Sequence, residues 1–208
     1  MTFFIIVSTD FFKRLETYQF IEARLKGDTH TVSGKVDFKF KVTLLGEASV
    51  GKTSLVLRFV KDYFKEDLKS TIGTNFMIKK VDIDDIKVQL LIYDIGAQKI
   101  FSSMRAKYFQ GSNASIAIYD ITRPETLHAL PEWINSVREI NGNIPIMILG
   151  NKLDLEDQRR VPVMDAKNIA KRFTCMHAEV SAKTGESVEK VFKRVAKASL
   201  DEYQYCNS

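Results

Sequence analysis

An α/β fold with a mostly parallel six-stranded sheet and helices on both faces is the fold class that this sequence predicts. Short apolar runs such as Ala114–Tyr119 alternate with longer segments of helical periodicity, a pattern typical of a parallel sheet covered by helices. The 208 residues are 45% hydrophobic, enough for one domain with a sizeable core. Ligands of such folds bind at the carboxyl ends of the strands.

The order of the elements follows from apolar periodicity and turn residues. We expect strands at Phe38–Leu45, Asn75–Asp84, Lys87–Tyr93, Ala114–Tyr119, Ile144–Leu149 and His177–Val180. We expect helices at Ser54–Tyr63, Lys99–Gln110, Pro124–Ile140, Pro162–Phe173 and Glu186–Ser199. Pro124 suits a helix start, because the first helical turn does not need its missing N–H.

Two parts of different character are expected, an N-terminal extension at 1–37 and a main domain at 38–208. The extension carries apolar residues at helical spacing, namely Phe11, Leu15, Tyr18, Ile21 and Leu25. They predict an amphipathic helix ending near Gly27, and a linker follows it. Three interpretations stay open: the helix docks on a membrane or a partner, it folds onto the domain or a second copy, or the start is overlong.

The amino-acid composition indicates which cellular compartment and which classes of partner to expect. The net charge of +5 forms no clustered basic stripe, so no nucleic-acid partner is expected. Cys175 and Cys206 lack metal-ligand spacing, which fits a reducing, cytoplasmic compartment. No apolar run approaches the roughly 20 residues of a membrane-spanning helix, and no secretory leader is evident.

A phosphate-binding motif of the form G-x-x-x-x-G-K-T spans Gly46–Thr53, between a predicted strand and a predicted helix. Glycine permits the backbone shape that turns N–H groups toward phosphate oxygens, and the helix N-terminus adds its positive end. Lys52 is expected to reach the β- and γ-phosphates, and the Thr53 hydroxyl to bind Mg²⁺. The alternative is a strand-to-helix turn without a ligand. The motif in this context predicts a P-loop NTPase.

Two further motifs identify the base. Asn151-Lys152-Leu153-Asp154 follows one strand, and Ser181-Ala182-Lys183 follows the next. The Asp154 carboxylate can accept from guanine N1–H and the N2 amino group, neither of which adenine offers, and this discriminates by about 10⁴ or more. Residues 181–183 can present a backbone N–H to guanine O6. Solvated surface loops are the alternative, and an ATP-using P-loop kinase is disfavoured.

From Phe38 to about Ser199 the chain resembles a small GTPase of the Ras superfamily, most of all the Rab branch and its endosomal group. Beyond the three motifs, the segments that carry this resemblance are Ser54–Val60, Ser70–Gly73, Tyr93–Gln98, Tyr108–Gly111 and Tyr119–Thr122. The resemblance implies GTP or GDP with Mg²⁺ as ligands, and effector, exchange-factor and GTPase-activating proteins as partners.

The resemblance also implies roles for single residues. Thr71 would bind Mg²⁺ when the γ-phosphate is present, and Asp94 would hold a Mg²⁺-bound water. Phe64 would pack on the guanine, and Gln98 would orient the attacking water. The nucleotide is expected to contact Ala48, Ser49, Val50, Gly51, Lys52, Thr53, Ser54, Phe64, Thr71, Asp94, Ala97, Asn151, Lys152, Asp154, Ser181, Ala182 and Lys183.

The second switch departs from the family pattern D-x-A-G-Q-E. Gly96 and Ala97 stand in exchanged order, and Lys99 replaces the acid. The expected function is a slow GTP-hydrolysing switch, with vesicle traffic implied by the resemblance. The alternative is a GTP-binding scaffold with impaired hydrolysis.

The C-terminus departs as well. Cys206 is third from the end, not fourth as a prenylation box needs, so no prenyl anchor is expected. Contact with a membrane is then expected only through the N-terminal helix, and the protein is expected to be a monomer.

Overall fold

The computed structural model of the chain describes residues 36–65, 74–96 and 102–206, and only the backbone at 102–105. The chain divides between Lys35 and Val36 into two units, and all described residues belong to the second. The expected helix at 11–25 lies outside them, so the N-terminal extension stays a prediction.

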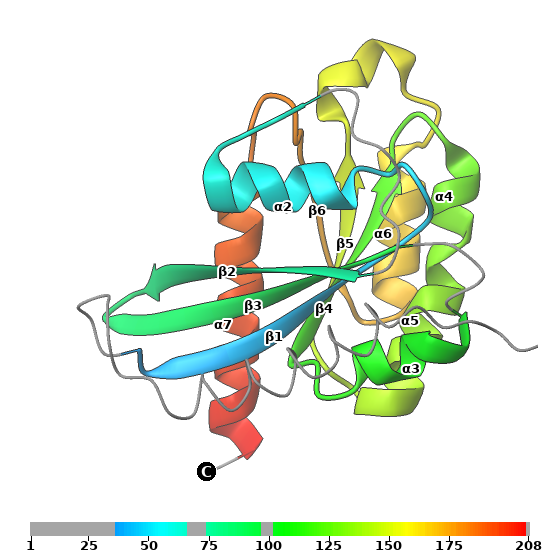
Figure 1. Ribbon diagram of the computed structural model, residues 1–208. Helices are drawn as coiled ribbons and strands as arrows, with labels where there is room; N and C mark the ends of the chain where they lie inside the picture. The colour runs from blue at the N-terminus through cyan, green and yellow to red at the C-terminus, as the bar shows by residue number, and fades with distance from the viewer. Residues whose placement is uncertain (1–35, 66–73, 97–101, 207–208) are drawn as a thin grey trace, which may run out of the picture. The chain divides into compact units, whose positions relative to one another are not determined.

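A six-stranded sheet in the order β2-β3-β1-β4-β5-β6 forms the centre of this unit (Figure 1). Its strands are β1 (Phe38–Leu45), β2 (Thr74–Ile83), β3 (Ile86–Ile95), β4 (Ala114–Asp120), β5 (Ile146–Asn151) and β6 (Met176–Glu179). Among the strands that the structure describes, only the edge pair β2–β3 is antiparallel, as its short connection requires. The predicted mostly parallel six-stranded sheet is therefore confirmed.

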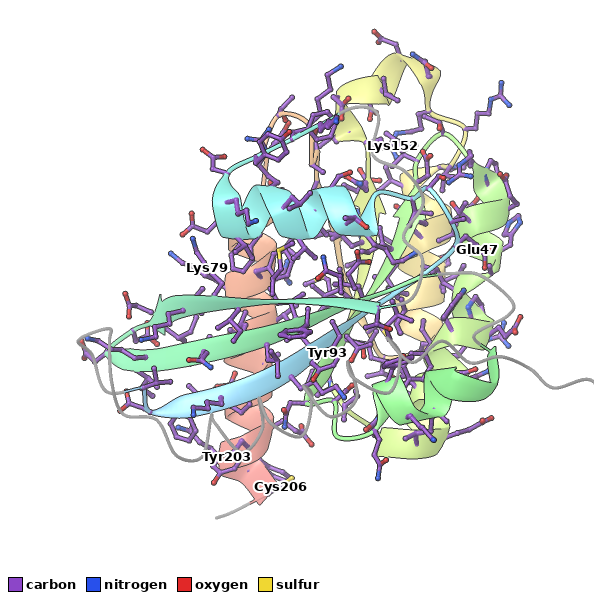
Figure 2. The ribbon with its side chains drawn as sticks, viewed as in Figure 1. Glu47, Lys79, Tyr93, Lys152, Tyr203 and Cys206 are labelled. Atoms are coloured by element: carbon purple, nitrogen blue, oxygen red, sulfur yellow. The ribbon has the colours of Figure 1, made fainter. Side chains whose placement is uncertain are left out.

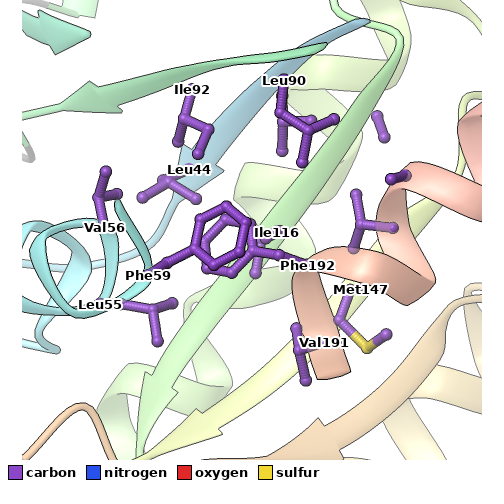
Figure 3. Packing of buried hydrophobic residues seen from close by; sticks show 14 of the residues in the cluster. Leu44, Leu55, Val56, Phe59, Leu90, Ile92, Ile116, Met147, Val191 and Phe192 are labelled. Atoms are coloured by element: carbon purple, nitrogen blue, oxygen red, sulfur yellow. The ribbon is translucent and has the colours of Figure 1, made fainter. Parts of the chain in front are cut away.

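One face of the sheet is covered by α2 (Lys52–Lys61) and α7 (Val188–Cys206). Alternate residues of β1, namely Phe40, Val42 and Leu44, belong to the hydrophobic cluster between these helices and the sheet. Figure 3 shows Leu44 in this cluster. At its centre the ring of Phe59 from α2 stacks on that of Phe192 from α7, with centroids 3.9 Å apart. This contact joins the two helices across the core.

The other face is covered by α5 (Leu130–Asn141), against which α3 (Ser102–Phe109) packs, and by α4 (Pro124–His128), which contacts β4 (Figure 1). The helix α5 buries Leu130, Trp133, Ile134 and Val137, spaced three and four residues apart on one side. Beyond β5 come the short 3-10 helix η2 (Leu153–Gln158) and α6 (Val163–Arg172), which contacts β5 and β6. Helices thus lie on both faces, as predicted.

Three expected boundaries were wrong for identifiable reasons. The single helix predicted at 124–140 is two helices that meet at Ala129, because Pro131 has no N–H to continue the first. The strand predicted from Ile144 begins at Ile146, after Pro145. The last helix continues past Ser199 to Cys206, where Tyr203 packs edge-on against Phe38 with centroids 5.4 Å apart.

We expect Phe192→Ala to lower the free energy of unfolding by about 3–5 kcal/mol, because it leaves a cavity under Phe59 in the closed core. Urea unfolding followed by circular dichroism measures this. Met164→Ala is the matched control, since Met164 is 62% exposed and its truncation should cost less than about 0.5 kcal/mol. Equal destabilisation by both variants would contradict the prediction.

Candidate nucleotide-binding site

The loop between β1 and α2 has the tight curve that a phosphate cradle needs. Gly46 has a φ of 130°, and a Cβ there would collide with the carbonyl oxygen of Ile118 in β4. Gly51 has a φ of 93°, and its Cβ would collide with the Asn151 side chain. Glycine is therefore required at both positions, by the backbone conformation and by the close approach of neighbouring strand ends.

Lys52, the first residue of α2, is a buried cation with 7% of its surface exposed. Its Nζ donates hydrogen bonds of 2.8 Å to the carbonyl oxygens of Gly46 and Glu47. The ammonium group is thus fixed against the loop at the N-terminal end of α2. Together with the positive end of the helix it provides an electrostatic site for an anionic group such as a phosphate.

Next to Lys52, the Thr53 hydroxyl donates a 2.5 Å hydrogen bond to Asp94 Oδ2. Asp94 is 3% exposed at the end of β3, where β1 pairs with β3 in parallel. A hydroxyl and a carboxylate are ligands that Mg²⁺ accepts, and it takes its other ligands from phosphates and water. Within the described ranges, no group of three or more His, Cys, Asp or Glu could hold a metal ion by itself. The two oxygens therefore fit Mg²⁺ that arrives with a nucleotide.

Asn151, 2% exposed at the end of β5, connects two of the predicted motifs. Its Nδ2 donates to the carbonyl oxygen of Val50 in the phosphate loop at 2.9 Å, and its Oδ1 accepts from the Ala182 N–H at 3.1 Å. One amide side chain thus fixes the distance between the phosphate loop and the loop after β6.

The remaining residues of these motifs bind to each other and to β4. Asp154 Oδ1 accepts a 2.5 Å hydrogen bond from Ser181 Oγ, which in turn accepts from the Thr184 N–H at 3.0 Å. Lys152 has a left-handed backbone with a φ of 72°, and its Nζ lies 2.6 Å from Asp120 Oδ2. The structure therefore brings the three motifs together at the carboxyl edge of the sheet, where the sequence analysis expected them.

Asp120, at the end of β4, is a buried acid that the sequence analysis did not single out for this site. Burial would raise the pKa of Asp120, but the hydrogen bonds from Lys152 and Thr122 outweigh it and hold that pKa below its ordinary value. Arg123 donates to Asp120 Oδ2 and also to the carbonyl oxygen of Ala48, each at 3.0 Å. Asp120 thus links the base motif to the phosphate loop. Its position at a strand end, like those of Asp94 and Asn151, was the available signal.

Glu47 is a second residue of the site that was not singled out. Its Oε1 accepts a 3.0 Å hydrogen bond from Trp133 Nε1, which ties the outer side of the phosphate loop to α5. Glu47 and Lys152 are labelled in Figure 2, at the edge where β1 and β5 end. The loop is therefore supported from both α5 and Arg123.

Some predicted contacts fall elsewhere or outside the described residues. Phe64 is half-buried and packs against the hydrophobic cluster of the sheet, so its expected contact with guanine stays a prediction. Thr71, Ala97 and Gln98 lie outside the described residues. Gly96, the last described residue before Ala97, is buried.

Behind the base motifs, Tyr119, His177 and Glu179 come from β4 and β6. Tyr119 Oη donates to Glu179 Oε1 at 3.1 Å, and Arg159 bonds both oxygens of Glu179 at 2.8 and 2.9 Å. Burial, and then the Glu179 charge, raise the pKa of Tyr119 well above its ordinary value, so Tyr119 stays protonated. A Cβ at Gly150 would lie 2.6 Å from Tyr119 Oη, so the glycine before Asn151 leaves room for this cluster.

Comparison with known proteins agrees with this geometry. The model of the Ras family matches residues 41–201. The chain is 38% identical over 161 residues to Ras-related protein RABA4b of Arabidopsis thaliana, an overlap of 77% of this chain and 72% of the relative. It is 38% identical over 173 residues to Ras-related protein Rab-31 of Rattus norvegicus, covering 82% and 89%, and 39% over 160 residues to Rab-31 of Mus musculus, covering 76% and 82%.

The chain belongs to the Ras family. It is a Rab-like small GTPase, an enzyme that hydrolyses GTP to GDP and acts as a molecular switch in membrane traffic. The expected resemblance and P-loop NTPase fold are thus confirmed, and the scaffold alternative is not favoured. Rab proteins work with effectors, exchange factors and GTPase-activating proteins, so this GTPase is expected to have partners of these three kinds.

Among the helices of the described part of the chain, none is long and apolar enough to cross a membrane.

The stability of this Rab-like GTPase should fall as the pH drops below about 6.5, in part because of His177. Burial lowers the pKa of His177 from 6.5, and the charges of Lys167, Arg159 and Arg194 lower it further, against an opposing effect of Glu179. The unfolded chain therefore binds a proton at a pH where folded His177 stays neutral. We expect the free energy of unfolding to decrease less between pH 7.5 and 5.5 in His177→Gln than in the wild type.

The exposed histidine His128 provides the control. Urea unfolding of His128→Gln should show the same dependence on pH as the wild type. An unchanged slope in His177→Gln would contradict the prediction.

Proposed function

We propose that this Rab-like GTPase reads guanine through the Asp154 carboxylate and binds Mg²⁺ through Thr53, with Thr71 and Asp94 completing the protein's contribution. The observation that carries the proposal is the Asn151 side chain, which bonds the phosphate loop and the loop after β6. A nucleotide whose phosphates lie at Lys52 then meets the base-reading motifs at a fixed distance. Mg²⁺, when bound, neutralises negative charge on the β- and γ-phosphates.

Ser181 supports the assigned role of Asp154. Its hydroxyl donates to Oδ1 of Asp154, which limits the rotation of the carboxylate. A carboxylate has several acceptor lone pairs, so its two oxygens can still accept from both guanine N1–H and the N2 amino group. The backbone of residues 181–183 lies beside this carboxylate and is proposed to donate to guanine O6.

Hydrolysis requires a positioned water, and Gln98 is proposed to orient it for in-line attack on the γ-phosphate. The Ala97 N–H is proposed to contact that phosphate. The exchange of Gly96 and Ala97 adds a Cβ where the family has glycine and narrows the backbone conformations at the switch. We propose that binding of GTP is normal and that switching is slowed.

The cellular setting is a further part of the proposal. We propose a cytoplasmic switch that reaches membranes peripherally, through the N-terminal extension. Its apolar residues and its balanced charge favour an apolar contact over attraction to anionic lipids.

Guanine recognition is tested by Asp154→Asn. The amide nitrogen can donate a hydrogen bond to the C2 carbonyl of xanthine, but the amide has one acceptor oxygen and cannot accept the hydrogen bonds from both guanine N1–H and the N2 amino group. We expect the affinity for GDP to fall by about 100-fold or more, and xanthosine diphosphate to become the preferred ligand over GDP. Isothermal titration with GDP, xanthosine diphosphate and ADP measures both changes.

Asp157→Asn is the matched control, because it neutralises an exposed acid in the same short helix. It should bind GDP like the wild type. Tight GDP binding by Asp154→Asn, or wild-type protein that binds ADP as well as GDP, would overturn the proposal.

The second switch is tested by the double variant Gly96→Ala with Ala97→Gly, which restores the family order. We expect single-turnover hydrolysis of GTP to become several-fold faster, because glycine returns flexibility at the phosphate-facing position. Gln98→Leu should abolish this hydrolysis in both backgrounds. Equal rates for the wild type and the double variant would refute the role assigned to the exchanged residues.

A further inference from the structure

Arg58, in the last turn of α2, links the helix that begins at the phosphate loop to the loop that follows β6. Its Nε donates to the carbonyl oxygen of Ala182 at 3.0 Å, and its Nη2 donates to that of Lys183 at 2.6 Å. The side chain is only 18% exposed. A charged fork thus binds two successive peptide groups of the loop that is proposed to face the base.

The chemistry of the guanidinium suits this task. Its N–H groups lie in one plane at fixed spacing, so two adjacent carbonyl oxygens can be bound at once without further ordering. The third nitrogen, Nη1, bonds Asp62, whose carboxylate is 90% exposed. An exposed pair of this kind contributes little, so the contacts to the loop carbonyls dominate. A lysine at position 58 lacks the planar fork, so its one nitrogen cannot donate from the two separate positions that Nε and Nη2 occupy.

The same loop is bound from its other side. The Ala182 N–H donates to Asn151 Oδ1, while its carbonyl oxygen accepts from Arg58. The loop also curves closely around the stem of Arg58, since a Cβ at Gly185 would lie 3.5 Å from Arg58 Cδ. The orientation of these peptide groups is therefore set by Asn151 and Arg58 together.

We propose that Arg58 is a specificity-determining positioning residue that orients the 181–183 backbone toward guanine O6. This inference rests on the proposed guanine site and assigns to α2 a role in reading the base, in addition to its role at the phosphates. The contact with N1–H and the N2 amino group depends on Asp154, which bonds Ser181 and not Arg58. Loss of Arg58 should therefore affect recognition of O6 and spare recognition of N2.

Three nucleotides separate these contacts. GDP carries O6, N1–H and the N2 amino group. In 6-thio-GDP, O6 is replaced by sulfur, which is a weak hydrogen-bond acceptor, and inosine diphosphate lacks the N2 amino group. Dissociation constants for each, with Mg²⁺ at pH 7, are measured by titration on the full chain as wild type, Arg58→Lys and Arg58→Met. Asp62→Asn is the matched control, because it neutralises only the exposed carboxylate that pairs with Arg58.

We expect both Arg58 variants to bind GDP about tenfold more weakly or worse. Their preference for GDP over 6-thio-GDP should shrink by the same factor, while their preference for GDP over inosine diphosphate should equal that of the wild type. Asp62→Asn should match the wild type in all three constants. Thermal unfolding is used to check that each variant is folded. If Arg58→Met is unstable, the test relies on Arg58→Lys, which keeps the positive charge and the apolar stem of the side chain.

Two results would overturn the inference. The first is an unchanged ratio of GDP to 6-thio-GDP affinity in Arg58→Lys, and the second is an equal loss for all three nucleotides, which a general structural role would give. Wild-type protein that fails to prefer GDP over ADP would instead remove the proposed guanine site, and this inference with it.

Discussion

The amide of Asn151 is the contact on which the nucleotide site depends, because it bonds one loop through its donor and another through its acceptor. Val50 in the phosphate loop and Ala182 in the loop after β6 are far apart in sequence, and both bonds run through one buried side chain. A side chain with only donors or only acceptors could not make both. A Cβ at Gly51 would collide with this amide, so the glycine of the phosphate loop and the asparagine of the base motif depend on each other.

The buried carboxylate of Asp120, at the end of β4, supports that contact. Asp120 accepts from Lys152, Arg123 and Thr122, and Arg123 continues to the carbonyl oxygen of Ala48. Burying a carboxylate raises the free energy of the folded state unless several hydrogen-bond donors surround it. Here the donors belong to the base motif and to the loop after β4, the segments that surround the site. The loops stabilise the charge of Asp120, and that charge in turn fixes their positions.

The hydrophobic core positions the site from below. The stacked pair Phe59 and Phe192 fixes α2 against α7, and α2 carries Lys52 at its start and Arg58 in its last turn. The orientation of one helix thus controls both the cation at the phosphate loop and the guanidinium at the base loop. One helix therefore connects the phosphate loop to the loop after β6, the two halves of the proposed nucleotide site.

The sequence by itself determined the fold class, the order of the six strands along the chain and the three motifs, because apolar periodicity and glycine-rich turns are local properties. It also predicted that the motifs meet, since parallel strands end at one edge. The tertiary structure alone decided which side chains join them. Asp120, Glu47 and Arg58 stand in ordinary local patterns. The partners that tie them into the site, which are Lys152, Trp133 and Ala182 respectively, lie in distant parts of the chain. The end of α7 likewise depended on the distant contact of Tyr203 with Phe38, because only the folded chain brings these two rings together. The break before Pro131, by contrast, follows from a local property of proline that the sequence already contains.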